Sequence, residues 1–383
     1  MVVLYYTSTH FIDSVLETIK CIKDTIELHV IIEIAPESKT STIIKVNDLS
    51  SYSILEDCEV ILGEHQWLLI KKYFHGVASV KFIVHKDKRS LSISSLRVAS
   101  VLGKYIKNIK AEVIHFDTVS VRSIGLYPYI FDLKVFITVH DPIPHSGEAS
   151  WKNKLPKFVY YHLASGYFFY SSFAQKQFQK RFKAIGAPKV SLKLQPYTYV
   201  SQFITEEEYK NTTVLFYGRI SLYKGIDILI EAIPTILKWN PNVNFVIAGK
   251  ISAGYSLDNT AIKQFDKNVE LMTQYLSTED LVKIIRKANI VVCPYRDATQ
   301  SGVLMTTMAV GKPVIATNVG AFPEYISDNI NGFLAEPTPE AIAAKVIEAL
   351  TNQRYKNIER NICSSYSEEI GSINRDNILR CYL

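Results

Sequence analysis

Short apolar runs alternate with amphipathic stretches along the first 200 residues. Segments 11–24 and 92–107 have apolar residues at helical spacing. The runs predicted as strands are 2–6, 28–35, 79–85, 112–116, 134–140 and 166–172. Strands that alternate with helices imply a parallel sheet, because parallel neighbours need a crossover connection.

The second half repeats this alternation with longer apolar runs. Strands are predicted at 212–218, 243–249, 289–295, 313–319 and 332–337. Helices are expected at 225–239, from Ser277 to Ala288, and after Ser301, Phe322 and Pro339. Continuous apolar strands indicate a sheet covered on both faces. We therefore predict an α/β protein of two Rossmann-like, doubly wound domains that face each other across a ligand-binding cleft.

The overall composition fits two globular domains and excludes extended disorder. The chain has 383 residues, of which 48% are hydrophobic and 21% charged. No apolar stretch reaches the roughly 18 to 20 residues that cross a bilayer, and no secretory signal is recognisable, so we expect a cytoplasmic protein. The five Cys are widely spaced, which indicates reduced thiols and not a disulfide frame or a zinc site.

Positive charge is concentrated in the first half of the chain. Residues 1–200 hold 25 Lys and Arg against 17 Asp and Glu, and no acidic residue occurs in 149–205. Nine Lys and Arg in 151–193 interleave with aromatic residues that include Trp151 and the run Tyr167 to Tyr170. Two interpretations are open. One is a peripheral contact with an anionic membrane surface, and the other is a buried strand between two solvated helix faces.

The first candidate site combines a strand end with two cations. Phe216-Tyr217-Gly218-Arg219 ends a predicted strand, and Lys224-Gly225 follows at a helix start. Two positive side chains and free backbone N–H groups at one point suit a diphosphate. A solvated loop whose cations bond to carbonyl groups is the alternative. The G-x-G-x-x-G and G-x-x-x-x-G-K-[ST] fingerprints are both absent.

The second candidate site is a loop of small and polar residues, 295–305, that leaves a buried strand. It enters a helix at Ser301-Gly302, so that uncapped backbone N–H groups again face the cleft. Together the two patterns resemble the retaining nucleotide-sugar glycosyltransferases of family 4, which have the GT-B architecture. The resemblance is specific over roughly residues 214–337. In the first half it depends mainly on the segment 137–142, ITVHDP.

The resemblance assigns roles to individual residues. It implies that Arg219 and Lys224 hold the donor diphosphate and stabilise the charge of the departing nucleotide without a metal or another cofactor. It implies that His140, at the end of a predicted strand, faces the donor sugar. The remaining donor-binding residues that it implies are Gly218, Gln300, Ser301, Gly302, Val303 and Thr306.

The chain departs from the family at two positions. The family carries two glutamates eight positions apart around this loop, and Ala298 and Thr306 stand there in this chain. Thr306 can offer the ribose only a neutral hydrogen bond, and Ala298 offers none. Asp297 or Gln300 could substitute for the first carboxylate. The absence of both carboxylates puts in question which donor the chain uses and whether it is active.

By resemblance, we predict a retaining glycosyltransferase that moves a sugar from a nucleotide-sugar donor to a saccharide or lipid-linked saccharide, in cell-surface polysaccharide assembly. The expected domains are an acceptor-binding 1–200, a donor-binding 201–365 and a helix, 366–383, that crosses back to the first domain. No nucleic-acid-binding module is recognisable. The alternative is a catalytically silent sugar-nucleotide-binding or partner subunit. An epimerase is disfavoured by the missing glutamates, and a phosphorylase by the lack of a recognisable cofactor lysine.

Overall fold

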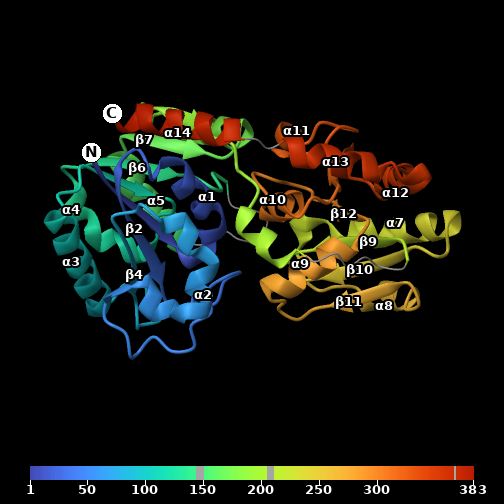
Figure 1. Ribbon diagram of the computed structural model, residues 1–383, viewed down its shortest axis with the longest axis horizontal. Coiled ribbons are helices and arrows are strands. Elements are labelled where there is room, and N and C mark those ends of the chain that lie inside the picture. Colours follow the sequence, from blue (N-terminus) through green and yellow to red (C-terminus); the bar gives the residue numbers. More distant parts are fainter. Residues whose placement is uncertain (144–150, 205–210, 366–367) are drawn as a thin grey trace. The chain divides into compact units, whose positions relative to one another are not determined.

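The chain folds into two compact units, each built around one sheet (Figure 1). The computed structural model describes residues 1–143, 151–204, 211–365 and 368–383. Unit 1 comprises residues 1–193 and 368–383, and unit 2 comprises residues 194–367. Both units show the predicted alternation of strands and helices.

Unit 1 contains an eight-stranded sheet in the order β3-β4-β2-β1-β5-β6-β7-β8. Its neighbouring strands are parallel except for the pair β3 and β4, which is antiparallel. The strands are β1 Val2–Ser8, β2 Glu27–Ile34, β3 Leu55–Asp57, β4 Ser79–Val84, β5 Val113–Phe116, β6 Lys134–Thr138, β7 Gly166–Phe169 and β8 Lys189–Ser191. The inner strands β2, β1, β5, β6 and β7 are buried on both faces, whereas the edge strands β3 and β8 are not.

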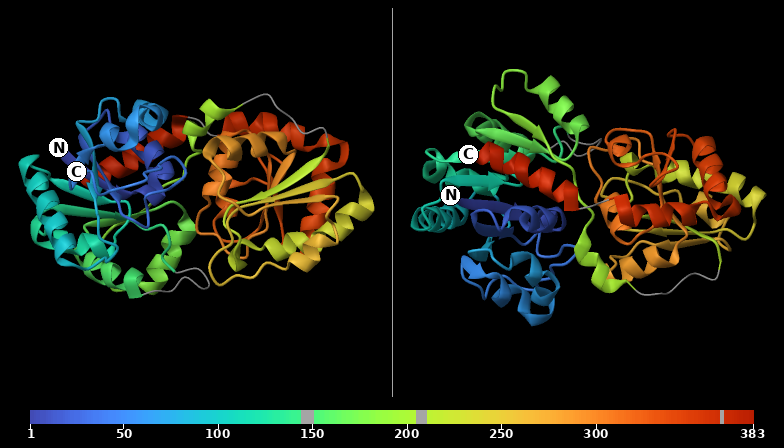
Figure 2. Two further views of the ribbon diagram at one scale, coloured as in Figure 1. Left: turned by 90° about the horizontal axis from the view of Figure 1, so that it is seen from below. Right: turned by 45° about the horizontal axis from the view of Figure 1, so that its top comes forward.

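Helices cover the two faces of this sheet (Figure 2). They are α1 Ile12–Ile22, α2 Cys58–Phe74, α3 Ile93–Asn108, α4 Tyr127–Ile130, α5 Trp151–Leu163, α6 Ser172–Arg181 and α14 Glu368–Tyr382, with 3-10 turns η1 Thr9–Phe11 and η2 Val121–Leu126. A capping box between Ser92 and Ser95 starts α3. Val98, Leu102 and Ile106 then recur at four-residue spacing and are buried in the core.

The last helix, α14, belongs to unit 1 and packs beside α1 (Figure 1). Its Tyr382 side chain is fully buried, and the phenol oxygen lies 2.5 Å from Nδ1 of His115 on β5. The other ring nitrogen of His115 lies 2.8 Å from the hydroxyl of Thr138. Lys134 donates to the carbonyl groups of Tyr382 and Leu383, both at 2.9 Å. A buried neutral imidazole therefore links α14 to the sheet.

Burial lowers the pKa of His115 to about 3, with a smaller contribution from His140. The unfolded chain therefore binds more protons between about pH 3 and 6.5, so stability falls as the pH decreases through that window. We expect the parent to lose about 2 kcal/mol more unfolding free energy between pH 7 and 5 than His115→Asn does. Urea denaturation at both pH values measures this difference. In the exposed control His65→Asn, the unfolding free energy should change with pH as in the parent. The same pH dependence in His115→Asn would show that His115 does not cause this loss of stability.

Unit 2 contains a six-stranded parallel sheet in the order β11-β10-β9-β12-β13-β14. The strands are β9 Thr213–Tyr217, β10 Asn244–Ala248, β11 Val269–Met272, β12 Ile290–Cys293, β13 Val314–Thr317 and β14 Phe333–Ala335. The helices are α7 Ile226–Trp239, α8 Asn259–Lys263, α9 Thr278–Lys287, α10 Gly302–Ala309, α11 Phe322–Tyr325, α12 Pro339–Leu350 and α13 Tyr355–Ser365, with η3 Thr198–Phe203, η4 Leu222–Lys224 and η5 Thr351–Gln353. The predicted start of α9 is confirmed, because Ser277 caps this helix: its Oγ accepts from the Asp280 amide at 3.1 Å.

The segment 151–193 does not present its described aromatic residues to solvent. The side chains of Tyr160, Tyr161 and the run Tyr167 to Tyr170 are buried, most of them in the core cluster of unit 1. The interpretation that they contact lipid headgroups is therefore wrong, because they already pack against the sheet. The side chains of residues 151–155 and 158 lie outside the described part. Within that part, no helix combines the length and apolarity needed to span a bilayer.

Candidate functional site

In each sheet, chain connections lead in opposite directions from one pair of neighbouring strands. In unit 2 this pair is β9 and β12, because β9 continues to β10 on one side and β12 to β13 on the other. In unit 1 it is β1 and β5. Loops that leave such a pair diverge, so ligands bind outside the carboxyl ends of these strands. The predicted site residues follow strand ends at or next to these points.

In unit 2, the two sequence motifs meet directly after β9. Gly218 has a φ of 114°, and a Cβ added to it would lie 3.0 Å from a methyl carbon of Val303. Gly249, at the end of β10, has a φ of 147°, and its added Cβ would lie 1.8 Å from the Gly218 carbonyl oxygen. Only glycine fits both positions. The fold thus brings the Gly-Arg strand end against the first turn of α10.

Lys224 is held over the face of an aromatic ring. It ends η4 and is only 8% exposed, and its Nζ lies 3.8 Å from the ring centroid of Tyr295. Tyr295 follows β12 and is buried. An ammonium over a ring face is attracted to the electrons of that ring. Tyr295 therefore fixes a buried positive charge near the carboxyl ends of β9 and β12.

An ion pair ties the loop after β12 to the start of α7. Arg296 pairs with Asp227, and its Nη1 donates at 2.7 Å to that carboxylate. The Arg296 amide donates to the carbonyl of Tyr223 at 2.8 Å, and its side chain to the carbonyl of Leu222 at 3.0 Å. Although burial alone would raise the pKa of Asp227, the Arg296 guanidinium holds it below its usual range. These bonds fix the turn that carries Lys224.

Arg219 lies in the same loop but is exposed. Its Nη2 donates to the hydroxyl of Tyr223 at 3.3 Å. The hydroxyl of Ser221, between the two cations in sequence, is buried without a hydrogen-bond partner among the described residues. Buried polar groups normally have a partner, so this hydroxyl is available to a ligand.

Ser301 caps α10, whereas uncapped N–H groups were expected at this helix start. Ser301 is buried, and its Oγ accepts from the Leu304 amide at 3.2 Å. Gly302 is exposed, and an added Cβ would lie 3.3 Å from the hydroxyl oxygen of Tyr197. Gln300 and Val303 are half-buried. The first turn of this eight-residue helix therefore opens beside Gly218, with its N–H groups at the carboxyl edge of the sheet.

The two positions without family glutamates are both buried. Ala298 is 2% exposed, and its carbonyl accepts from the Ala321 amide at 2.8 Å. A Cβ added to Gly320 would lie 2.0 Å from that carbonyl oxygen. Thr306 lies within α10 and is 8% exposed. A closely packed turn therefore replaces the first carboxylate, and Asp297, next to it, is half-buried.

In unit 1, His140 contacts a buried carboxylate. Its Nε2 lies 3.2 Å from Oδ1 of Asp117, which follows β5 and is fully buried. Asp117 also accepts from the hydroxyl groups of Thr7 at 3.1 Å and Tyr5 at 3.4 Å. The ring of Phe11 stacks on His140 with 4.1 Å between centroids and 19° between planes. The imidazole is thus fixed from two sides at the carboxyl edge of the sheet.

Sequence reasoning missed Asp117 and Asp227, and it gave no individual role to Tyr295 and Arg296, although both lie in the loop 295–305. Asp117 directly follows a strand that was predicted, which is the position expected for a ligand-binding residue. No local pattern pairs Arg296 with Asp227, because 69 residues separate them. Among the described residues, no group of three or more His, Cys, Asp or Glu is arranged to hold a metal ion.

Comparison with known proteins finds a family match over most of unit 2. A model of the glycosyl transferases group 1 family matches residues 201–369. An uncharacterized glycosyltransferase of Methanocaldococcus jannaschii is 33% identical over 143 residues, which cover 37% of this chain and 39% of the relative. The D-inositol 3-phosphate glycosyltransferase of Segniliparus rotundus is 30% identical over 142 residues, which cover 36% of this chain and 32% of the relative. The matches span about two fifths or less of these relatives.

Solved structures resemble the chain over its whole length. A glycosyltransferase from Rickettsia africae has a TM-score of 0.64 at 16% identity and covers 99% of this chain and 97% of its own. The Anabaena protein HepE, in complex with UDP and glucose, has a TM-score of 0.63 at 15% identity, and the match covers 99% of this chain and 98% of HepE. At such identities the likeness shows the fold alone. The predicted GT-B fold is confirmed.

Proposed function

We propose that this chain, whose residues 201–369 match the model of the glycosyl transferases group 1 family, is a retaining glycosyltransferase. It transfers a sugar from a nucleoside-diphosphate donor to a saccharide or lipid-linked saccharide, in the assembly of cell-surface polysaccharide. The observation that carries the proposal is the buried Lys224 ammonium, held on Tyr295 beside the first turn of α10. HepE, which shares the fold, was solved with UDP-glucose, and this supports a nucleotide sugar as donor.

The residues of the loop after β9 match the chemistry of a diphosphate leaving group. As the bond between the sugar C1 and the diphosphate oxygen breaks, negative charge develops on that oxygen. Lys224, Arg219 and the N–H groups at the start of α10 would stabilise this charge. The acceptor hydroxyl attacks C1 from the side the nucleotide leaves, and its proton passes to the departing phosphate oxygen. His140, fixed by Asp117 and Phe11, would orient the donor sugar.

A donor screen tests this proposal. The purified chain is mixed with UDP-, GDP-, ADP- and CMP-sugars, and thermal stabilisation and nucleotide release are measured together. We expect one donor class to stabilise the protein and to be turned over slowly, with both effects reduced in Arg219→Ala. Absence of stabilisation by every donor would reject the proposal. Turnover that stays unchanged in Arg219→Ala would reject the assigned diphosphate site.

One observation favours a second function. The two carboxylates of the family are absent at Ala298 and Thr306, and the turn around Ala298 is closely packed. A silent sugar-nucleotide-binding or partner subunit accounts for this loss. It predicts donor stabilisation without nucleotide release even when lipid-linked acceptors are supplied. Release of nucleotide above the rate of spontaneous hydrolysis would exclude it.

A lipid-linked acceptor would require this chain to meet a membrane, and one surface of unit 1 suits that contact. Leu91, Ile93 and Leu96, around the start of α3, are 51%, 88% and 60% exposed. Exposed cations flank them: Lys86, Lys88, Arg89 and Arg97. Asp87 pairs with Arg89, which leaves an excess of positive charge. Exposed apolar residues among cations favour an anionic bilayer surface. This loop follows β4, at the same sheet edge as His140.

Vesicle sedimentation tests this surface. We expect the parent to sediment with vesicles that contain phosphatidylglycerol and to remain in solution with pure phosphatidylcholine. The double variant Ile93→Glu, Leu96→Glu should lower the bound fraction about tenfold or more, because it removes apolar contact and adds repulsion. Ile330→Glu, at a residue 58% exposed in unit 2, is the matched control. Equal sedimentation of the two variants would exclude this surface.

A further inference from the structure

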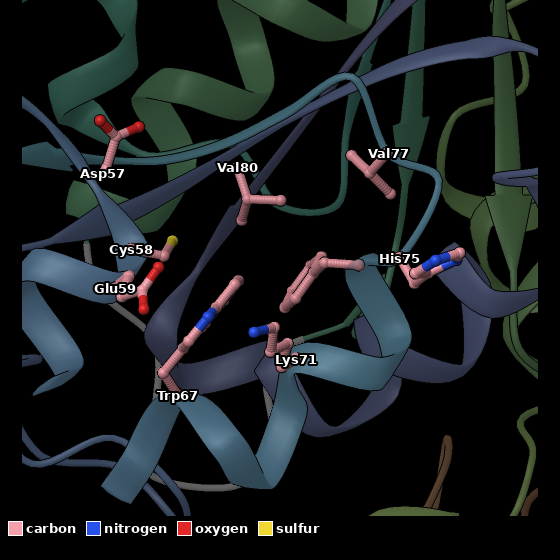
Figure 3. A pocket seen from close by; sticks show the side chains of 9 residues that line it. Asp57, Cys58, Glu59, Trp67, Lys71, His75, Val77 and Val80 are labelled. Carbon is pink, nitrogen blue, oxygen red and sulfur yellow. The ribbon is translucent and has the colours of Figure 1, made fainter. Parts of the chain in front are cut away.

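A cavity lies in unit 1, at the edge of the sheet opposite to His140 and Asp117. It has a volume of about 310 Å³ and is bounded by α2, the end of β3 and the turn that leads into β4 (Figure 3). Val77 and Val80 line it at the amino end of β4, whereas the candidate site follows carboxyl ends. This volume is at the lower end of the range typical of small-molecule sites, about 300 to 1,000 Å³.

Two parallel aromatic rings form one wall of this cavity. Trp67 and Phe74 are seven residues apart on α2, so that two helical turns place them on the same face. Their rings are stacked, with 5.7 Å between centroids and 9° between planes. Such a wall offers a flat apolar surface to a ligand. At this spacing no further ring fits between them, so a ligand would stack on the exposed side.

The wall also contains a hydrogen-bond donor without a partner. The indole nitrogen of Trp67 is buried and has no acceptor among the residues that the structure describes. An indole N–H can only donate, and buried donors are normally satisfied. Figure 3 shows Trp67 with Glu59 and Lys71 around the same hollow. A ligand oxygen would satisfy this donor.

Charged and neutral groups complete the lining. Glu59 and Lys71 are exposed at the rim, and the Asp57 carboxylate pairs with Lys81 at 2.5 Å. Burial, together with the charge of Asp57, raises the pKa of the Cys58 thiol well above its usual value. This thiol is therefore a neutral part of the wall and not a nucleophile. The cavity thus combines an apolar face, the hydrogen-bond donor of Trp67, and a rim where Glu59 can accept hydrogen bonds and Lys71 can donate them.

We propose that this cavity binds a pyranose ring of a neutral saccharide, as a second contact for the acceptor chain; this role rests on the proposed transferase function. A pyranose has an apolar C–H face that stacks on the rings and hydroxyl groups at its edge. One hydroxyl oxygen accepts from the Trp67 indole, and another hydroxyl donates to Glu59.

The site lies at the far end of β4 from the predicted centre of transfer. Five residue steps separate Ser79 from Val84, about 17 Å of strand. A saccharide that reaches from one edge of the sheet to the other would need several sugar units. The cavity would therefore hold an earlier unit of a growing chain while its end is extended, which raises the effective concentration of the acceptor.

Binding of neutral trisaccharides tests the inference. Maltotriose, cellotriose, mannotriose and UMP are each titrated into the full chain and followed by saturation-transfer NMR. Trp67→Phe keeps the ring and removes the donor, and Glu59→Gln removes the charge. The matched control is Trp239→Phe, at the end of α7. We expect at least one trisaccharide to bind at millimolar concentration, about fivefold or more weakly in Trp67→Phe and unchanged in the control.

Three results would overturn the inference. They are no binding of any trisaccharide, equal binding in Trp67→Phe and Trp239→Phe, and binding of UMP that depends on Trp67. Lys224→Ala separates this test from that of the proposed function, because this variant should lose donor turnover and keep trisaccharide binding. Trisaccharide binding that depends on Trp67 in a chain without turnover supports the cavity alone. Turnover in a chain that binds no trisaccharide rejects the cavity alone.

Discussion

Lys224→Met is expected to lower the rate of sugar transfer about 100- to 1,000-fold, with little change in the thermal stability of the free protein. The substitution keeps the length of the side chain and removes its charge. A preorganised charge in a buried position acts mainly on the leaving diphosphate, so its loss lowers kcat more than it raises KM. Steady-state nucleotide release with the donor identified by the screen measures both constants.

Two comparisons make this prediction specific. Lys238→Met, at an exposed position near the end of α7, should have the parental rate. Tyr295→Phe keeps an aromatic face under the ammonium and should retain most activity, whereas Tyr295→Leu removes the face and should lose about tenfold or more. If Lys224→Met and Lys238→Met were equally active, Lys224 would have no role in transfer. If Tyr295→Leu matched Tyr295→Phe, the ring would not position the lysine.

Gly225→Ala is expected to destabilise unit 2 by about 3 kcal/mol or more, which corresponds to roughly 6 to 12 °C in the melting temperature of a unit of this size. Gly225 has a φ of 66°, and an added Cβ would lie 1.9 Å from the carbonyl oxygen of Pro294. Backbone must move to relieve this contact, because neither atom belongs to a flexible side chain. The movement would also displace the neighbouring Lys224. Calorimetry with the donor screen measures both effects.

Gly254→Ala is the matched control for backbone strain. Gly254 also has a positive φ, 81°, but no atom lies within 4 Å of its added Cβ. We expect this variant to lose only about 1 kcal/mol, the cost of placing alanine in the left-handed region. An equal loss in both variants would mean that strain and not the contact with Pro294 decides the effect at Gly225.

The unit 2 part of the candidate site was largely predictable from the sequence. A strand end, a loop and a helix start lie next to each other in the chain, so Gly218, Lys224 and Ser301 could be recognised from local patterns. Local capping chemistry proved correct at Ser277, whereas the cap at Ser301 was not predicted. What holds Lys224 in place was not predictable, because Tyr295 comes from a different strand and contacts it only after the sheet has formed.

The surface of unit 1 was the least predictable feature. The aromatic residues in 166–170 are buried, most of them in strand β7. This could not be predicted, because an apolar run beside basic residues has the same composition whether it packs inward or faces a lipid. Leu91, Ile93 and Leu96 give no unusual signal in the sequence, yet all three are exposed. Sequence also gave no warning of the cavity at Trp67, since α2 and β3 were not among the predicted elements.

By itself, the sequence determined the α/β class, the repeated alternation, most strands and helices, and the positions of the two candidate motifs after β9 and β12. Each of these depends on interactions between residues near in the chain, such as apolar periodicity and helix capping. Only the tertiary structure decided which strands are neighbours, and therefore where the chain directions diverge. It also decided that Asp117 meets His140, that Tyr295 lies under Lys224, and that Trp67 and Phe74 line a cavity. These arrangements depend on contacts between segments distant in the chain, which side-chain packing selects and local sequence does not encode.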